Sequence, residues 1–315
     1  MTPRVLSTGM AVPLRRMSNH DLAQTLDTSD EWIYSHTGIR YRYIAAEGEN
    51  TSDLAVRACQ QALTRSGKTA DDVDLILLAT GSPDYPGFPS SASLVQDKLG
   101  CQYAGAMDLV AACSGFVYAL ETARSFLISG AAHLVLVVGA EVFSRIVDWS
   151  DRSTCVLFGD GAGAVLVGMD DQLPTDSFRP SLLSSDGSGA LALTSRTAIS
   201  PFVHMEGRRV YNFAVQVMKD LIPSILEKNF LTVNDIQWIV PHQANFRIIE
   251  ATAKRLDIPI EKFYTNIEEY ANTSGASIPL ALAEMDHKGL LVRGAWVLTI
   301  GFGAGLTAGA NLFRW

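Results

Sequence analysis

The sequence lacks an apolar stretch long enough to cross a membrane. Its longest such run, Leu134 to Phe143, is interrupted by Gly139 and Glu141 and falls short of the roughly 18 residues that a span requires. Prolines and an arginine also stand near the N-terminus, where a secretory signal needs an unbroken apolar core. We therefore expect neither a membrane-spanning helix nor an export signal, and we expect the protein to reside in the cytoplasm.

Paired cysteine motifs are absent as well. The 4 cysteines show no CxxC spacing, which argues against a zinc knuckle and against a disulfide framework. We expect no bound metal and a free thiol at each cysteine, namely Cys59, Cys101, Cys113 and Cys155.

Basic residues are too scattered to attract nucleic acid. The formal net charge is -8 at pH 7, and lysines and arginines form no long run. A chain with this charge repels nucleic acid and anionic membranes. An acidic protein partner must therefore dock on a local basic patch.

What the sequence does contain is an alternation of short apolar runs with longer segments of helical period. This alternation predicts an α/β fold in which helices are layered around sheet. The expected strands, which we expect to be buried on both faces, are Leu75–Thr80, Leu134–Val138, Cys155–Phe158, Ala164–Val167, Trp238–Val240 and Trp296–Ile300. The expected helices are Ser52–Arg65, Ser114–Ser129, Val210–Lys228 and Asn245–Leu256.

An internal repeat runs through the chain. The segment Asp72–Leu78 resembles Asp235–Pro241, and the strand containing Gly139 resembles the strand containing Gly301. Two further matches keep the same order along the chain: Ala119-Leu120 with Ala281-Leu282, and Gly161–Leu166 with Thr307–Leu312. The repeat predicts two similar halves that pack against each other around a cleft.

We place the boundary between the two halves near residue 170. The first half, residues 1–170, carries Cys113, and the second half, residues 171–315, carries a histidine and an asparagine described below. Residues 177–209 are rich in Ser, Gly and Pro with little periodicity. We expect them to form an inserted loop region over the cleft.

Cys113 is the cysteine with a setting suited to chemistry. It stands where an apolar segment turns into a helix, as in a nucleophile elbow. Unpaired backbone N–H groups at a helix start favour the thiolate over the thiol and can donate to an oxyanion. A buried structural role is the alternative reading of any free cysteine, and we assign that role to the other three.

Two polar residues in the second half stand in comparable places. His242 follows the strand Trp238–Val240 and leads into a helix, and ligands of α/β sheets bind beyond strand ends. Asn272 precedes the helix that the repeat pairs with the one after Cys113. A surface or hydrogen-bonded structural role for the histidine and a capping role for the asparagine are the alternatives.

Three motifs carry a resemblance to a known family. AACSGF around Cys113, PHQAN around His242 and NTSGAS at Asn272, in this order and spacing, resemble the 3-oxoacyl-[acyl-carrier-protein] synthase III family. The resemblance runs through the whole chain and includes DTSDEWI, FGDGAGA and GFGAG. It implies a dimeric protein with a thiolase-like fold, in which two βαβαβαββ halves form a five-layered αβαβα sandwich.

The resemblance also implies a reaction. In such enzymes the cysteine, here Cys113, takes an acyl group from acyl-CoA, and malonyl-acyl carrier protein then decarboxylates to a carbanion that attacks the acyl group. His242 and Asn272 would donate hydrogen bonds to the malonyl thioester oxygen. The backbone N–H groups of Cys113 and Ala304 would hold the acyl oxyanion, although Ala304 replaces the glycine more usual in the family. The most expected primer is acetyl-CoA, and no cofactor is tightly bound.

Substrate-binding positions follow from the same resemblance. Trp32 and Arg152 match positions that sandwich the CoA adenine, and Gly207 and Asn245 match positions that contact the pantetheine arm. His36 replaces an arginine common near the CoA phosphates, which predicts weaker or pH-dependent phosphate binding.

Partner-binding positions are implied in the same way. Phe88 matches a residue that reaches into the acyl pocket of the partner subunit. Arg247, Lys254 and Arg255 share one face of a helix that starts just after His242, and we expect this face to dock acyl carrier protein. A solvated helix surface is the alternative.

Other functions remain open from the sequence alone. A related condensing enzyme with another acyl primer in secondary metabolism carries the same motifs. A hydrolase with Cys, His and Asn would use the histidine as a base for the thiol, and a non-catalytic scaffold would not be acylated at Cys113. The glycine-rich segments at 159–163 and 301–305 do not complete a GxGxxG nucleotide loop.

Overall fold

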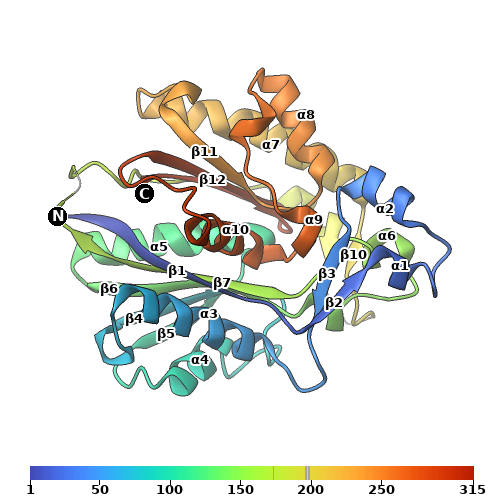
Figure 1. The fold of residues 1–315 in the computed structure, drawn as a ribbon, viewed down its shortest axis with the longest axis horizontal. Helices are drawn as coiled ribbons and strands as arrows, with labels where there is room; N and C mark the ends of the chain where they lie inside the picture. Colours follow the sequence, from blue (N-terminus) through green and yellow to red (C-terminus); the bar gives the residue numbers. More distant parts are fainter. Residues whose placement is uncertain (173, 196, 198) are drawn as a thin grey trace.

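Helices and sheets alternate in five layers through the molecule (Figure 1). The computed structural model describes residues 1–172, 174–195, 197 and 199–315. A larger sheet and a smaller sheet lie on either side of two central helices, and further helices cover the outer face of each sheet. The central helices are α5 (Gly115–Ser129) and α10 (Ser277–His287), and the outer helices are α3 (Thr51–Ser66) and α4 (Ser91–Leu99) on one side and α7 (Gly207–Lys228) and α8 (Phe246–Leu256) on the other. The predicted αβαβα sandwich is confirmed.

The larger sheet has the strand order β1-β7-β6-β4-β5. Its strands are β1 (Thr2–Ala11), β4 (Leu75–Ala79), β5 (Gly105–Leu109), β6 (Leu134–Glu141) and β7 (Gly161–Asp170). Strand β4 runs parallel to β5 and β6, whereas β7 is antiparallel to β6 and β1. Every residue of β4 and β6 is buried, because helices cover both faces of the sheet.

The smaller sheet repeats this topology in the order β11-β12-β13-β8. Its strands are β8 (Leu182–Ser185), β11 (Ile236–Pro241), β12 (Trp296–Gly303) and β13 (Thr307–Arg314). Strands β11 and β12 are parallel, and β13 is antiparallel to both of its neighbours. A single parallel bridge between Ile239 and Phe263 stands where the larger sheet has β5.

The internal repeat corresponds to these matching strands. The two copies of the first repeated segment lead into β4 and form β11, and Gly139 and Gly301 occupy the same position in β6 and β12. The repeated Ala-Leu pairs lie in the two central helices. Strand β7 ends at Asp170, where we place the boundary between the halves; a division into domains at that residue stays a prediction.

Two expectations about local structure are wrong. Residues Cys155–Phe158 do not form a strand, because α6 (Arg152–Cys155) ends there and the Asp151 side chain caps it by accepting the Ser153 N–H. Short apolar runs do not distinguish a strand from a buried turn of helix. Residues 177–209 are more than a loop, since β8 pairs with β13. Within that range, residues 196 and 198 lie outside the described residues.

Smaller elements gather at one end of the molecule (Figure 1). Strands β2 and β3 form an antiparallel pair, and α1 and α2 lie between them in the chain. Strand β9 pairs with β10. Their bounds are β2 (Arg15–Ser18), α1 (Asn19–Leu22), α2 (Asp30–Thr37), β3 (Tyr41–Ile44), β9 (Leu193–Thr194), β10 (His204–Met205) and α9 (Ile267–Tyr270). In the described part of the chain, no helix is long and apolar enough to cross a membrane, and no group of three or more His, Cys, Asp or Glu is arranged to hold a metal ion.

Candidate active site

The three residues singled out in the sequence line one cavity. Cys113, His242 and Asn272 all border a space of about 270 Å³. Cys113 lies just before α5, His242 follows the end of β11, and Asn272 lies just before the turn that starts α10. The fold thus brings together groups from both halves of the chain, as the repeat predicts.

A sharp turn places Cys113 at the start of α5. The single-turn helix Ala112–Ser114 leads directly into α5 at Gly115, and Ala112 has a φ of 46°, in the left-handed region. Such backbone strain in a non-glycine residue is a frequent feature of functional sites. Strand β12 passes so close that a Cβ at Gly303 would lie 2.9 Å from the Cys113 Cβ.

The surroundings of Cys113 keep it protonated. Burial raises the pKa of the Cys113 thiol to about 12, and the nearby Glu141 charge adds to the rise, whereas a hydrogen bond with Ser274 acts in the opposite direction. The backbone N–H groups at the helix start, which we expected to favour the thiolate, are outweighed by desolvation. The thiol proton must therefore leave before the sulfur attacks a substrate.

His242 is fixed as a neutral imidazole. Burial lowers the pKa of His242 to about 3, and its ring packs edge-on against Phe302 with centroids 5.1 Å apart. Its Nδ1 lies 2.7 Å from Ser277 Oγ, which also accepts the Gln243 N–H. When the Ser277 hydroxyl donates to Nδ1, the imidazole carries its proton on Nε2, the other ring nitrogen.

Asn272 is oriented by three hydrogen bonds. Its backbone N–H donates to the Leu157 carbonyl, and its carbonyl accepts the Gly159 N–H. Its side-chain oxygen accepts the Ser274 N–H at 2.8 Å. Because the oxygen is engaged, the –NH₂ group is the part of the amide left to donate to a ligand.

A smaller apolar cavity adjoins the sulfur on another side. Its volume is about 60 Å³, and its lining includes Cys113, Phe143, Phe158, Leu193, Val203 and Ala304. The rings of Phe143 and Phe158 stack with centroids 4.8 Å apart. Ala304 thus lies beside Cys113, and the left-handed backbone falls at Gly305, with φ 128°, so a side chain at position 304 meets no strain of that kind.

Three of the four predicted CoA-binding residues line the same 270 Å³ cavity as Cys113. These are Trp32, Gly207 and Asn245. The Arg152 guanidinium lies 4.8 Å from the Trp32 ring centroid, so a base enters between them only if Arg152 moves off the ring. His36 stacks on Trp32 with centroids 4.4 Å apart.

The Asn245 amide is already used within the protein. Its oxygen accepts the Arg247 N–H and so caps α8, and its –NH₂ donates to the His36 carbonyl. A contact with a pantetheine arm would have to share or displace these hydrogen bonds.

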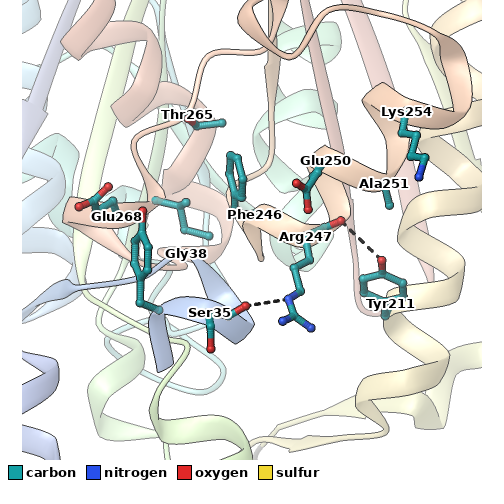
Figure 2. Close-up of a pocket in the computed structure, with 12 residues that line it drawn as sticks. Ser35, Gly38, Tyr211, Phe246, Arg247, Glu250, Ala251, Lys254, Thr265 and Glu268 are labelled. Atoms are coloured by element: carbon teal, nitrogen blue, oxygen red, sulfur yellow. Dashed lines mark hydrogen bonds between the residues drawn. The ribbon is translucent and has the colours of Figure 1, made fainter. Parts of the chain in front are cut away.

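A second cavity of about 890 Å³ lies outside the first, between α2, α7 and α8 (Figure 2). Tyr211 lines both cavities, so they adjoin. Arg247 and Lys254 line the outer cavity, and Arg247 Nε donates to the Ser35 carbonyl at 2.8 Å. Arg255, the third residue of the predicted docking face, is not part of its lining.

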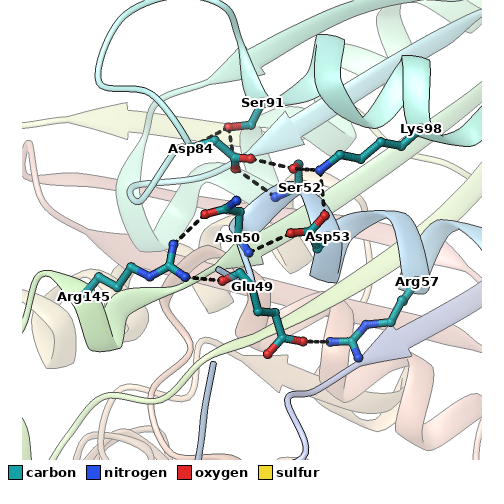
Figure 3. Close-up of polar contacts among 9 residues, drawn as sticks. All are labelled: Glu49, Asn50, Ser52, Asp53, Arg57, Asp84, Ser91, Lys98 and Arg145. Atoms are coloured by element: carbon teal, nitrogen blue, oxygen red, sulfur yellow. Dashed lines mark hydrogen bonds and ion pairs between the residues drawn. The ribbon is translucent and has the colours of Figure 1, made fainter. Parts of the chain in front are cut away.

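Phe88 projects from the surface on an anchored loop. Its side chain is 93% exposed, and it does not line either of the cavities at Cys113. At the base of the loop, the Asp84 carboxylate accepts from Ser52 N at 2.9 Å, Ser52 Oγ at 2.6 Å and Ser91 Oγ at 3.3 Å (Figure 3). The loop is therefore held firmly while its tip is free.

The sequence did not single out Glu141, Ser274 or Ser277. All three are buried and lie behind the residues that face the cavity. Ser274 and Ser277 follow Asn272 within the same motif, which is a signal that could have found them. Glu141 stands out only as an acidic residue at the end of an otherwise apolar strand.

Comparisons with known proteins agree with this geometry. The family model described as 3-oxoacyl-[acyl-carrier-protein (ACP)] synthase III matches residues 107–187, and the model of its C-terminal part matches residues 226–315. A beta-ketoacyl-[acyl-carrier-protein] synthase III of Clostridium acetobutylicum is 46% identical, covering 99% of this chain and 98% of the relative.

Solved structures are also similar. The 3-oxoacyl-[acyl-carrier-protein] synthase III of Aquifex aeolicus matches with a TM-score of 0.94 and 43% identity, covering 99% of this chain and all of that one (100%). The priming beta-ketosynthase of the R1128 polyketide biosynthetic pathway matches with a TM-score of 0.94 and 35% identity, covering 99% and 96%.

Proposed function

The chain belongs to the 3-oxoacyl-[acyl-carrier-protein] synthase III family, and we propose that it condenses an acyl-CoA primer with malonyl-acyl carrier protein. The products are a 3-oxoacyl-acyl carrier protein, CO₂ and CoA, and the step initiates fatty acid biosynthesis. The observation that carries the proposal is that Cys113, His242 and Asn272 border one cavity.

In the first half of the reaction Cys113 becomes acylated. Its sulfur attacks the thioester carbonyl of the primer, and CoA leaves as the C–S bond to it breaks. The oxyanion formed on the way is held by the backbone N–H groups of Cys113 and Ala304, two residues that line the small apolar cavity. A thioester on cysteine keeps a reactive carbonyl for the second attack.

In the second half, malonyl-acyl carrier protein loses CO₂ and the resulting carbanion attacks the acyl group. His242 Nε2–H and the Asn272 –NH₂ donate to the thioester oxygen on which negative charge develops. Both donors are neutral, because an amide does not titrate and burial lowers the His242 pKa to about 3. Loss of one such preorganised donor raises the barrier by about 2.7–4 kcal/mol.

The size of the acyl cavity supports a short primer. One water molecule needs roughly 10–15 Å³ of comparable space, so the 60 Å³ beside Cys113 suits an acyl chain of a few atoms. We therefore place acetyl-CoA first among primers. The side chains of Phe143 and Phe158 form the apolar wall against which the acyl group would rest.

The remaining parts of the proposal concern binding. The CoA and phosphopantetheine arms enter past Trp32, Arg152, Gly207 and Asn245, and neither is a tightly bound cofactor. Acyl carrier protein docks on α8 through Arg247, Lys254 and Arg255. The protein acts as a cytoplasmic homodimer in which Phe88 of each chain completes the acyl pocket of the other.

A two-stage assay tests the proposal. The protein is incubated with a panel of acyl-CoAs, and peptide mass spectrometry locates the adduct; malonyl-acyl carrier protein is then added and the 3-oxoacyl product measured. We expect an acetyl adduct on Cys113 that is consumed during condensation. An adduct on another residue, or sustained thioester hydrolysis without carbon–carbon bond formation, contradicts the proposal and favours a hydrolase.

A second function in the same class is condensation with another primer in a specialised pathway. The 35% identity to a priming beta-ketosynthase of a polyketide pathway favours keeping it as the alternative. The same acyl-CoA panel distinguishes the two, because a specialised enzyme would acylate Cys113 faster with a longer or branched primer than with acetyl-CoA.

A further inference from the structure

The Cys113 sulfur has one side-chain hydrogen-bond partner among the described residues. Ser274 Oγ lies 3.3 Å from Sγ, and both side chains are buried. Ser274 sits in a strained turn with a φ of 48°. The turn is fixed because Asn272 accepts the Ser274 N–H and Glu141 accepts the Gly275 N–H. The hydroxyl is therefore held beside the sulfur by the backbone around it.

Glu141 lies against the same turn, because its carboxylate accepts the Gly275 N–H at 3.2 Å. Burial raises the pKa of Glu141, against hydrogen bonds from Ser82, the Gly81 N–H, Ser274 and the Gly275 N–H, which act in the opposite direction. Its carboxylate accepts the N–H groups of Gly81 and Ser82 at 3.0 Å. Within residues 1–172, 174–195, 197 and 199–315, no Lys, Arg or His forms an ion pair with it. Glu141 is thus a buried base with no neutralising cation.

His242 is poorly placed to take the thiol proton. Its Nδ1 is engaged by Ser277, and a buried imidazole with a pKa of about 3 is a weak base. The hydrogen bonds described for its side chain do not include one to Cys113. A general base must reach the proton directly or through one intervening group, and Ser274, which contacts the sulfur and precedes the glycine held by Glu141, offers such a route.

We propose that Ser274 carries the thiol proton of Cys113 to Glu141 when Cys113 is acylated. The S–H bond breaks as Ser274 Oγ accepts that proton, and the Ser274 hydroxyl proton passes to the Glu141 carboxylate. The thiolate then attacks the acyl-CoA carbonyl, and CoA leaves as a thiolate that takes a proton from water. The step rests on the proposed function.

The same path returns the proton during condensation. When the carbanion attacks the acyl group, the tetrahedral intermediate collapses and expels Cys113 as a thiolate. Protonated Glu141 then gives its proton to Ser274, and Ser274 gives its own to the sulfur. Cys113 is again a thiol and Glu141 again a carboxylate, so the site is ready for the next primer.

Electrostatics favour moving a proton over creating a charge. The Glu141 charge raises the pKa of Cys113, because two negative charges in one buried site repel each other. Transfer of the proton leaves a single negative charge, which moves from Glu141 to the sulfur. Ser274 is in this scheme a catalytic residue, since it touches the reacting sulfur, and Glu141 is a positioning residue that acts through it.

The test measures acylation alone. Single-turnover release of CoA from acetyl-CoA, without malonyl-acyl carrier protein, is followed for the wild type, S274A, H242A and the control S114A. Ser114 is also a buried hydroxyl beside Cys113, but it hydrogen-bonds to the Ala111 carbonyl and Thr307 instead of the sulfur. We expect S274A to acylate about 100-fold more slowly, in the range of general acid–base effects, and S114A to acylate within about threefold of wild type. H242A removes a donor of the second half-reaction and should acylate faster than S274A.

The pH profile separates proton transfer from structural support. The titratable groups facing Cys113 are Glu141 from β6 and His242 after β11; the groups that contact Glu141 are backbone N–H groups and hydroxyls. Wild-type acylation should fall as acid protonates Glu141, and this fall should begin above the ordinary carboxyl range because burial raises the Glu141 pKa. In S274A the proton must leave to solvent, so the rate should rise about tenfold per pH unit towards the thiol pKa of about 12.

E141Q serves as the second variant. It should slow acylation as S274A does and lose the acid limb of the profile, while circular dichroism and thermal unfolding report whether it folds. The proposal is overturned if H242A acylates as slowly as S274A, or if S274A keeps the wild-type pH profile. Absence of an acyl-enzyme in the wild type would instead overturn the proposed function.

Discussion

Two turns related by the internal repeat present different functional groups. The turn at Ala112–Ser114 and the turn at Ser274–Ala276 each precede a central helix, and their first residues have φ values of 46° and 48°. The first turn presents Cys113, whereas the second begins beside Asn272 and presents Ser274. The same backbone geometry therefore holds the proposed nucleophile in one half and its proposed polar partners in the other.

The strands that contact these turns differ in a corresponding way. Strand β6 ends at Glu141 and β12 ends at Gly303, which occupy equivalent positions. Glu141 reaches across to hold the second turn through Gly275, whereas Gly303 has no side chain and admits Cys113. Each half thus contacts the turn of the other half. At the last position of the strand, Glu141 anchors the facing turn by a hydrogen bond, whereas Gly303 allows the facing turn to approach closely.

Replacing Cys113, the proposed nucleophile of the first turn, should have the largest effect on activity. We expect C113A to lower condensation by about 10⁴-fold or more, since no other residue of the first turn offers a thiol to carry the acyl group. Product formation with acetyl-CoA and malonyl-acyl carrier protein is the measurement. C101A is the matched control, because Cys101 is buried elsewhere, in the core beneath α3 and α4; full condensation by C113A would contradict the assignment.

Removing the amide tests the second turn. We expect N272A to lower the rate of malonyl decarboxylation by about 10²–10³-fold, because one preorganised donor is lost, while acyl-enzyme formation on Cys113 persists. The two half-reactions are measured separately by CO₂ release and by mass spectrometry. An equal decrease in the rates of decarboxylation and acylation would mean that Asn272 supports the fold of the site and does not act in decarboxylation alone.

Adding a methyl group at Gly139 or Gly301 tests the close packing of each strand against the turn of the other half. A Cβ at Gly139 would overlap the Gly275 carbonyl oxygen, and one at Gly301 would lie 3.0 Å from Ser114 Cα. We expect G139A and G301A each to lower the free energy of unfolding by about 1–3 kcal/mol. In urea unfolding, the control G187A should stay within about 0.5 kcal/mol, because a Cβ there meets nothing within 4 Å.

Substitutions on the outer helices α8 and α4 should have smaller effects on activity. We expect R247A and K254A on α8 each to raise the KM for malonyl-acyl carrier protein by about two- to fivefold, as exposed ionic contacts do, without changing acetylation of Cys113. Lys98 on α4 is the control, since it pairs with Asp53 on the opposite side of the sandwich. A similar KM change in K98A would point to a general charge effect.

The smallest expected effect is that of pH on decarboxylation. Burial lowers the His242 pKa to about 3, so the neutral donor is present at all higher pH and is lost only as pH falls through that value. Malonyl decarboxylation should therefore vary little between about pH 5 and 9, whereas acylation falls on the acid side. A matching acid limb in both half-reactions would contradict this separation.

The sequence predicted the features that depend on a few neighbouring residues. The repeat predicted the matching strands, and the positions of Cys113, His242 and Asn272 at strand ends and helix starts predicted that they share a cleft. Their roles in the reaction remain predictions drawn from the family. Local patterns are sufficient here because a turn, a strand end and a helix start each depend on a few neighbouring residues.

Contacts between distant segments were not predictable in this way. Glu141 counted in the sequence only as an interruption of an apolar run, and its hydrogen bond to Gly275 spans 134 residues. Strand β8 forms because it pairs with β13, a register that composition does not reveal. The pairing of Trp32 with Arg152 was expected from the family resemblance and not from local patterns, since it depends on how two distant segments meet.

The anchored loop that carries Phe88 has a consequence for mixtures of chains. Asp84, Ser52 and Ser91 fix the base of the loop, so in the proposed homodimer each chain would lend an aromatic side chain from a well-anchored loop to its neighbour. Primer selection would then be a property of the pair. Co-assembly of wild type with F88A would give three kinds of dimer, and the mixed dimer would hold two sites of unequal size within one particle.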